Sequence, residues 1–508
     1  MFSKIMTVAL AWPDGSETEI QTDISKGLPY FDITGMGDTA VREASRRVRR
    51  AIVNSGFEYP KGRIAINLAP AYIKKSGSHY DLGMAMGILT ASGAVRGQTE
   101  NILFAGELAF DGRVLPVKGL LSMLFPVIGG LISRGLKEIV LPAGNCPEVY
   151  IMTRETEIDL IPVTDLKTAA CHVDGKKQKP YRPSVSREEK KEPSADFSDV
   201  RGNTEAKEAI MTAVAGGHSL LMTGAPGSGK TMMAERIPGI LPPMTIEEKI
   251  STTMIYSYAG RLTPEEPYIM SRPFRHVDAG ITKAALIGGG GRPWPGEVSF
   301  AHNGVLFMDE MLQLPPGIIE LLRQPLEEKR ICLTRQSGTA VFPADFIFIG
   351  AANPCPCGNL GDPERICTCT AGEIERYRSR LSGAIADRID ICIEVNRPKY
   401  SSLVEKEHVS SAEMREKIIR VRNTQIERAG MLNSAMRERD VEAYCRLSGD
   451  GEAFMKTVYE REKISARKYF KLLRVARTVA DIKGSENISL SHLTAAWHYV
   501  RTPGGERV

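Results

Sequence analysis

A glycine-rich octapeptide near the middle of the chain has the residue types that bind nucleotide phosphates. It fits the pattern G-x-x-x-x-G-K-[ST] and comprises Gly224, Ala225, Pro226, Gly227, Ser228, Gly229, Lys230 and Thr231. Glycines let backbone N–H groups turn toward a phosphate, Lys230 adds a positive charge, and the Thr231 hydroxyl can ligate Mg²⁺. An apolar run precedes the octapeptide and a helix-compatible run follows it, as this pattern requires. The octapeptide therefore predicts a site for a nucleoside triphosphate and Mg²⁺.

Two acids at the end of a later apolar run add the chemistry of hydrolysis. Residues 305–308 are apolar and lead directly into Asp309 and Glu310. Asp309 can hold Mg²⁺, and Glu310 can polarise a water molecule for attack on the γ-phosphate. Such a pair is a weak signal alone, but after a phosphate loop it predicts hydrolysis of the bound nucleotide.

Three further polar residues are candidates for the same site. Asn353 ends another apolar run, where its amide could orient the attacking water. The alternative is that Asn353 only forms a turn before Pro354. Arg388 could reach the γ-phosphate of a neighbouring subunit, and Arg467 could contact phosphate within its own chain. As single arginines, both are also compatible with surface ion pairs.

Four of the nine cysteines form two tight pairs, Cys355-x-Cys357 and Cys367-x-Cys369. Four thiolates in a reducing compartment predict a structural Zn²⁺ site, in which protein ligands fill every position. The spacing within each pair is tighter than the usual C-x₂-C. Unligated thiols, and a redox pair or iron–sulfur cluster, are therefore the alternatives.

Two segments, 287–296 and 329–335, are candidates for contact with DNA. Their cations could follow phosphates, and an exposed aromatic ring could stack on a base. The alternative for the tryptophan is packing under its own proline-rich loop. The whole chain has a formal net charge of only +5, so a DNA site must be a local patch. The candidate contact residues are Arg292, Trp294, Lys329, Arg330 and Arg335.

Buried strands must position the phosphate loop, the acids and Asn353. Four apolar runs, separated by helix-compatible segments, occur at 218–224, 305–310, 346–353 and 389–395. Continuous apolar strands that alternate with helices predict a parallel sheet covered on both faces. After Pro398 the apolar residues recur at helical spacing. The clearest amphipathic stretches there are 412–429, 467–482 and 489–500.

The length of 508 residues and a globular composition predict an α/β multidomain protein. The segment 175–195 is rich in Lys, Glu, Pro and Ser, as linkers are. No stretch reaches the length and apolarity of a membrane span, and a short apolar run before Pro13 is a poor signal peptide. We therefore expect a cytoplasmic protein without a membrane partner. The predicted divisions are 1–174, the linker 175–195, a phosphate-loop core 196–397 and a helical region 398–508.

The order of these motifs resembles that of AAA+ ATPases. The sequence between the motifs narrows the resemblance to the magnesium-chelatase-like YifB/ComM family. The similar segments include GAPGSGKTMMAERIPGILPP, GAANPCPCG and DRIDI, and the match runs nearly end to end. The resemblance implies ATP and Mg²⁺ as cofactors, ring hexamers with ATP between subunits, and a C-terminal helical lid. It assigns Walker A to 224–231, Walker B to Asp309 and Glu310, sensor 1 to Asn353, the arginine finger to Arg388 and sensor 2 to Arg467.

The N-terminal region resembles the protease-type α/β domain of Lon. The similar segment is FAGELAFDGRVLPVKGL, and strands at 63–69 and 101–108 and a helix at 42–54 are predicted around it. That family uses a Ser–Lys dyad. Here Asp81 lies in the serine region and Leu121 stands at the lysine position. Because neither residue can form the dyad, we predict an inactive binding or assembly module.

Together these features predict an ATP-driven motor on single-stranded or branched DNA. The family resemblance implies a helicase or branch-migration translocase in recombination or natural transformation. The alternatives are a protein remodeller, a magnesium-chelatase motor subunit and a nucleotide-gated scaffold. The chelatase alternative needs a partner subunit with a metal-binding domain, and intact Glu310 and Arg388 disfavour a scaffold.

Overall fold

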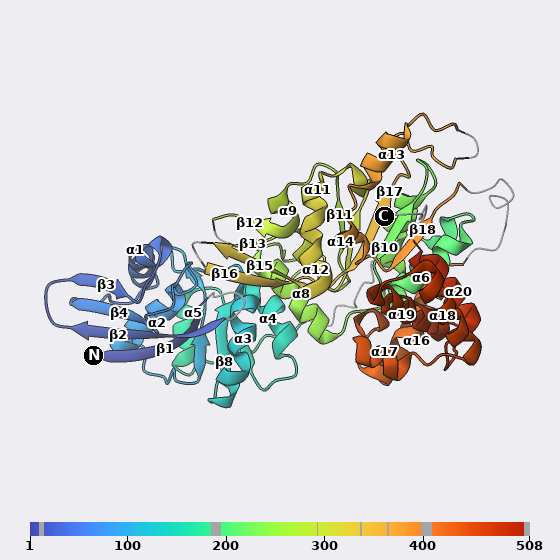
Figure 1. Ribbon diagram of the computed structural model, residues 1–508. Coiled ribbons are helices and arrows are strands. Elements are labelled where there is room, and N and C mark those ends of the chain that lie inside the picture. Colours follow the sequence, from blue (N-terminus) through green and yellow to red (C-terminus); the bar gives the residue numbers. More distant parts are fainter. Residues whose placement is uncertain are drawn as a thin grey trace. The chain divides into compact units, whose positions relative to one another are not determined.

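The computed structural model describes residues 1–9, 15–183, 195–291, 293–335, 338–362, 365–397 and 409–501. The chain divides into two compact units, and Figure 1 labels many of their elements. The first unit is Met1–Glu189 with Thr245–Met270, and the second is Lys190–Met244 with Ser271–Val508. Within the described ranges, no helix combines the length and the apolar character needed to cross a bilayer.

The first unit mixes strands and helices. Its strands are β1 (Phe2–Ala9), β2 (Ser16–Ser25), β3 (Tyr30–Thr34), β4 (Arg63–Ala69), β5 (Ile102–Phe104), β6 (Glu107–Leu108), β7 (Val114–Leu115), β8 (Glu138–Pro142) and β9 (Asp159–Val163). Its helices are α1 (Thr39–Asn54), α2 (Asp81–Ala91), α3 (Leu120–Ser133), α4 (Cys146–Thr153), α5 (Leu166–Val173) and α8 (Ile246–Tyr258).

Seven of these strands form one sheet in the order β3-β4-β2-β1-β5-β8-β9. The β1–β2 and β2–β4 pairs are antiparallel, whereas β1–β5, β5–β8 and β8–β9 are parallel. Helices α1, α2 and α5 cover one face, and α3 and α4 cover the other. In α1 the buried residues Val41, Ala44 and Val48 recur at helical spacing, which is why the sequence predicted a helix here.

Helix α8 joins the first unit although it comes from the middle of the sequence. Its Ile250 and Met254 pack with Leu121 of α3 in one apolar cluster. The Ser122 hydroxyl also donates a hydrogen bond to the Met254 carbonyl oxygen at 2.7 Å. The predicted core 196–397 includes this segment without interruption, and no sequence feature separated it. In the structure the chain leaves the second unit after residue 244 and returns to it at residue 271.

The second unit contains the remaining elements. Its strands are β10 (Leu220–Thr223), β11 (Phe274–Val277), β12 (Gly288–Gly289), β13 (Trp294–Pro295), β14 (Val305–Met308), β15 (Arg330–Arg335), β16 (Gly338–Pro343), β17 (Ile347–Ala352) and β18 (Ile391–Glu394). Its helices are α6 (Thr204–Gly216), α7 (Lys230–Ile240), α9 (Lys283–Ile287), α10 (Glu297–Phe300), α11 (Pro316–Ile319), α12 (Arg323–Glu328), α13 (Ala371–Arg378), α14 (Gly383–Ala386), α16 (Ser411–Ala429), α17 (Glu438–Tyr444), α18 (Gly449–Glu462), α19 (Ala466–Ile482) and α20 (Leu490–Val500).

A parallel five-stranded sheet in the order β11-β14-β17-β10-β18 forms the centre of this unit. Four of its strands coincide with the apolar runs that predicted a parallel sheet, and the edge strand β11 was not predicted. Helices α6 and α7 and the C-terminal helices α16, α19 and α20 contribute to one apolar core with the sheet. The helical C-terminal region therefore shares an apolar core with the sheet, and its helix α20 contacts the edge strand β18.

Candidate nucleotide site and cysteine cluster

Three adjacent strands of the second unit bring the predicted phosphate-site residues together. β10 leads into the phosphate loop, β14 into Asp309 and β17 into Asn353, and parallel strands present their carboxyl ends at one edge. The cavity at this edge has about 180 Å³. Pockets that enclose a whole ligand have roughly 300–1,000 Å³, so this cavity matches only the phosphate end of a nucleotide. It is lined by Pro226, Gly227, Lys230, Thr231, Asp309, Glu310, Ala352 and Asn353.

The Lys230 ammonium lies buried beneath the loop, with 8% of the residue exposed. Its Nζ donates to the carbonyl oxygens of Gly224 at 2.7 Å and Ala225 at 3.0 Å, and to Asn353 Oδ1 at 3.4 Å. Burial lowers the pKa of Lys230, and the nearby carboxylates of the site oppose this shift. Since the ammonium touches both the loop and Asn353, it connects the two strand ends.

The loop itself offers an open cradle. Gly227 and Gly229 have φ values of 77° and 96°, a region that strongly favours glycine. A Cβ atom added to either residue would meet no atom within 4 Å. Helix α7 begins immediately afterwards at Lys230, so its free N–H groups and dipole favour an anion at this position. The loop therefore fits a phosphate group.

Oxygen ligands suitable for Mg²⁺ lie next to this cradle. Thr231 Oγ1 donates to Asp309 Oδ2 at 2.7 Å, and the Glu310 backbone N–H donates to Asp309 Oδ1 at 2.8 Å. A hydroxyl beside a carboxylate is a donor set that Mg²⁺ accepts. Glu310 has a positive φ of 46°, an uncommon conformation for a residue with a side chain. Its exposed carboxylate lines the cavity.

The two candidate arginines do not line the cavity. Arg388 is buried except for 7% of its side chain, and its guanidinium forms an ion pair with Glu327 of α12. Arg467 Nη2 lies 3.9 Å from the other oxygen of the same carboxylate. The hydrogen bond from Arg388 lowers the pKa of Glu327. Sequence reasoning missed Glu327, because one acid in a charged helix gives no sign of the distant arginines that it meets.

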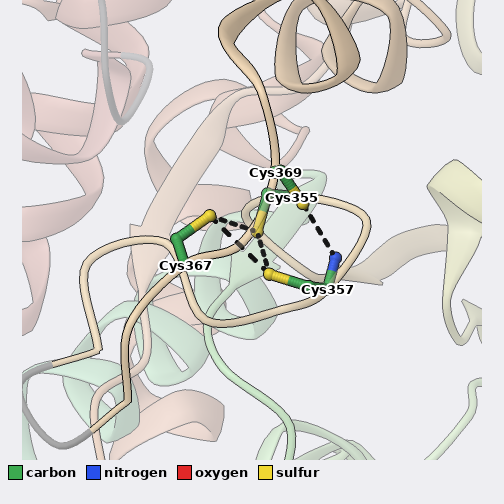
Figure 2. A group of neighbouring side chains, drawn as sticks. All are labelled: Cys355, Cys357, Cys367 and Cys369. Atoms are coloured by element: carbon green, nitrogen blue, oxygen red, sulfur yellow. Dashed lines mark hydrogen bonds between the residues drawn. The ribbon is translucent and has the colours of Figure 1, made fainter.

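The four cysteines converge from two stretches of chain that flank a loop, as Figure 2 shows. The Sγ atoms of Cys355, Cys357 and Cys367 lie 3.4–3.7 Å apart. The Cys357 backbone N–H points to Cys369 Sγ at 3.3 Å. All four sulfur atoms lie within 4.8 Å of one another, and the described part of the chain has no other comparable group of possible metal ligands. Hydrogen bonds from the backbone of Asn359 and then Thr368 lower the pKa of Cys357 to about 5.

The two segments predicted to contact DNA lie side by side in the second unit. β12 pairs with β13, β15 pairs with β16, and the four strands lie near one another in Figure 1. Arg335 Nε donates to the Gly290 carbonyl oxygen at 3.3 Å, which links the two hairpins. Trp294 is 42% exposed, so it is not enclosed by its own loop. Lys329 pairs with Asp345 at 3.2 Å.

The remaining candidates for DNA contact are Arg330 and Arg292. Arg330 pairs with Glu328 at 3.3 Å, so this cation is partly neutralised. Arg292 lies outside the described residues.

Asp81 and Leu121, which the resemblance to Lon singled out, both contribute to the packing of the first unit. Asp81 is buried at the start of α2, and Arg47 Nε donates to its Oδ2 at 2.6 Å. Burial raises the pKa of Asp81 to about 6, although the Arg47 guanidinium acts in the opposite direction. Leu121 is fully buried in the cluster that holds α8.

A second buried acid, Glu148, links α8 to α4 within the first unit. Glu148 of α4 accepts hydrogen bonds from Asn145 Nδ2 at 2.7 Å and from Ser257 Oγ of α8 at 2.9 Å. Burial raises the pKa of Glu148 to about 7. This carboxyl group is therefore partly protonated near neutral pH.

The sheet order, the glycine cradle and the converging acids define a P-loop unit of the AAA+ motor class. The family described as "Magnesium chelatase, subunit ChlI" matches residues 196–403. "Subunit ChlI of Mg-chelatase" matches 20–145, and the C-terminal ChlI family matches 408–500.

Full-length relatives narrow this class. A protein called YifB from Salmonella typhimurium is 36% identical over 94% of this chain and 93% of its own. "Competence protein ComM" from Haemophilus influenzae is 34% identical over 94% of both chains. More distantly, "Lon protease" from Rhizobium meliloti is 23% identical over 39% of this chain and 25% of its own. The chain belongs to the YifB/ComM-type, magnesium-chelatase-like family.

Proposed function

We propose that the protein binds and hydrolyses ATP and uses the energy to move along DNA. The observation that carries this proposal is the convergence of Lys230, Thr231, Asp309, Glu310 and Asn353 around one cavity at the carboxyl edge of the sheet. These groups follow the carboxyl ends of three adjacent strands, and each has the chemistry that a phosphate, Mg²⁺ or an attacking water requires.

The proposed roles follow from where each group lies. The backbone N–H groups of the loop and the Lys230 ammonium hold the β- and γ-phosphates. Thr231 and Asp309 would hold Mg²⁺, which neutralises charge on the phosphates when bound. Glu310 accepts a proton from the attacking water, and the Asn353 amide orients that water. Asn353 also accepts a hydrogen bond from Lys230, the proposed phosphate ligand. The Asn353 side chain would therefore connect the attacking water with the group that holds the phosphate.

Assembly into a hexameric ring is part of the proposal. Arg388 would act as the finger toward a neighbour's nucleotide, and Arg467 would contact phosphate in its own chain. In the single chain both guanidinium groups face Glu327 instead. We infer that these arginines must exchange this carboxylate for phosphate during the hydrolytic cycle.

DNA is the proposed track, in single-stranded or branched form, with helicase or branch-migration activity in recombination or natural transformation. The linked hairpins support this proposal, because Arg335 of β15 contacts Gly290, which lies between β12 and the strand that carries exposed Trp294. Stacking and phosphate contacts suit a sequence-independent grip. The name of the relative "Competence protein ComM" is in accord with this role.

We also propose roles for the four cysteines and for the first unit. The four cysteines would hold a structural Zn²⁺ ion, and the cytoplasm would keep their thiols reduced. The first unit would keep a Lon-type fold as a binding or assembly module without protease activity, since the serine region holds Asp81 and no serine, and Leu121 stands at the lysine position.

ATP hydrolysis by the full chain, without DNA and with single-stranded, duplex and four-way-junction DNA, tests the proposal. We expect several-fold stimulation, strongest with single strands or junctions, and expect Trp294→Ala with Arg335→Ala to remove it while basal hydrolysis persists. Arg439→Ala, an exposed arginine of α17, is the matched control. Hydrolysis that no DNA changes, with no DNA binding at low salt, would refute the DNA role and favour a protein remodeller.

A further inference from the structure

We propose that the four cysteines form a zinc clasp that holds the phosphate loop and Asn353 in their working positions. This inference rests on the proposed nucleotide site, and it assigns that site a metal-dependent support. Three features of the molecule support it: the geometry of the sulfur atoms, the weak apolar anchoring of the loop, and the contacts that lead from the loop to the cavity.

The sulfur geometry fits one tetrahedral ion. With Zn–S bonds of about 2.3 Å, the sulfur atoms of a tetrahedral site lie about 3.8 Å apart. The separations among Cys355, Cys357 and Cys367 are 3.4–3.7 Å. A disulfide would need about 2.05 Å, so these thiols are not paired with one another. The N–H···S hydrogen bond onto Cys369 is of the kind that stabilises a thiolate ligand.

Burial of apolar side chains does not account for the order of the loop between the cysteine pairs. Among its described residues from Pro356 to Cys369, only Gly358 is buried, and Ile366 is 89% exposed. Fixing each residue of such a loop costs about 1–2 kcal/mol of backbone entropy. Metal coordination supplies free energy that a small apolar core would otherwise have to supply.

Both arms of the clasp reach the nucleotide site. On the first arm, Cys355 follows Asn353 by two residues, and Gly358 lies so close to the phosphate loop that an added Cβ would come within 2.6 Å of Pro226 Cδ. A shift of this arm therefore moves the end of β17 and releases one side of the phosphate loop.

The second arm returns to the same place through α13. Cys369 immediately precedes Thr370, which caps α13. From that helix, Tyr377 accepts a hydrogen bond from the Asn353 backbone N–H, and Arg378 Nε donates to the Pro354 carbonyl oxygen at 3.5 Å. A metal that joins the two arms thus closes a ring of chain around Asn353.

The metal is tested first by its stoichiometry in the full chain. We expect one zinc per chain by elemental mass spectrometry, and thiolate-to-cobalt charge-transfer absorption after exchange with Co²⁺. The double variant Cys367→Ser with Cys369→Ser should lose the metal. The control Cys332→Ser changes an exposed cysteine of β15 outside the cluster and should keep it. A chain purified without bound metal, or with iron–sulfur absorption, would overturn the proposal.

The clasp role is tested by the affinity for a fluorescent ATP analogue in the absence of DNA. If the loop without zinc adopts the competent arrangement about one tenth of the time, the Kd rises about tenfold. Should the double variant misfold, zinc can be displaced from the Cys332→Ser chain by a mercurial reagent. A thiol and Zn²⁺ should then restore the affinity.

The possible failures are distinguishable. Loss of zinc that leaves the Kd within twofold overturns the clasp and leaves the ATPase proposal intact. A chain that keeps zinc but binds no nucleotide overturns the proposed function, and with it the purpose of the clasp.

Discussion

Both units bury charged groups, but they use them differently. In the second unit, Lys230 lies under a glycine loop with open space above it, next to groups suited to phosphate and Mg²⁺. In the first unit, the Asp81 carboxylate and the Arg47 guanidinium satisfy each other at 2.6 Å. Burial of charge is common to both places. A candidate site differs from a structural ion pair because its buried polar groups lie beside a space that a ligand can enter. In an ion pair the two charged groups neutralise each other instead.

The largest expected effect concerns Glu310 and tests the candidate nucleotide site. Replacing Glu310 by Gln removes the proposed general base but keeps its size, so hydrolysis should fall by about 10²–10⁴-fold. Binding of a fluorescent ATP analogue should change little, because Glu310 is not proposed to hold the phosphates. Phosphate release measures the first effect, and Glu442→Gln on exposed α17 is the control. Undiminished hydrolysis would remove Glu310 from the mechanism.

The next effect tests the structural ion pair. Arg47→Met leaves Asp81 buried without its partner, which should lower the free energy of unfolding by about 3–5 kcal/mol. Urea unfolding followed by circular dichroism measures the change. Arg46→Met alters an exposed neighbour on the same helix and should be close to neutral. Equal midpoints for the two variants would contradict the structural role.

A pH effect of similar size concerns Glu148, whose pKa rises from 4.5 to about 7 on folding. Between these values the unfolded chain loses the proton while the folded chain keeps it, so stability falls as pH rises through this window. The loss amounts to about 3 kcal/mol. Glu148→Gln should not show it, and its thermal midpoint relative to wild type should therefore be higher at pH 8 than at pH 4.5.

The control for this pH effect is Glu155→Gln, which changes an exposed acid of the same unit. If Glu148→Gln and wild type keep the same difference at both pH values, the buried acid does not titrate as described.

The smallest expected effect concerns Glu327, whose ion pairs involve arginines that are also proposed to bind phosphate. Glu327 neutralises Arg388 and Arg467, which the proposal assigns to phosphate. A partly exposed ion pair is worth about 0.2–1 kcal/mol, so Glu327→Gln should raise hydrolysis about 1.4- to 5-fold. The rate is measured at high protein concentration, with Glu328→Gln as the neighbouring control. A lower rate would indicate that Glu327 positions the arginines rather than competing for them.

Much of the second unit could be predicted because its signals are local. Continuous apolar runs reveal buried parallel strands, and the residues at their carboxyl ends must meet at one edge, which is where Asp309 and Asn353 are found. The membership of α8 could not be predicted in this way. Its apolar residues Ile250 and Met254 indicate that one face is buried, but not against which partner. The role of Glu327 could not be predicted for the same reason, because ion pairs between residues far apart in the sequence leave no periodic pattern.

The excursion of residues 245–270 into the first unit has a consequence for biosynthesis. The ribosome releases the chain from its N-terminus, and N-terminal domains usually fold as they emerge. Here the surface around Leu121 and the Glu148 carboxyl group cannot be covered until α8 has been made, after the phosphate loop. We therefore expect the first unit to reach its final state only when a large part of the second has been synthesised. A chain shortened to its first 189 residues should expose an apolar patch and aggregate.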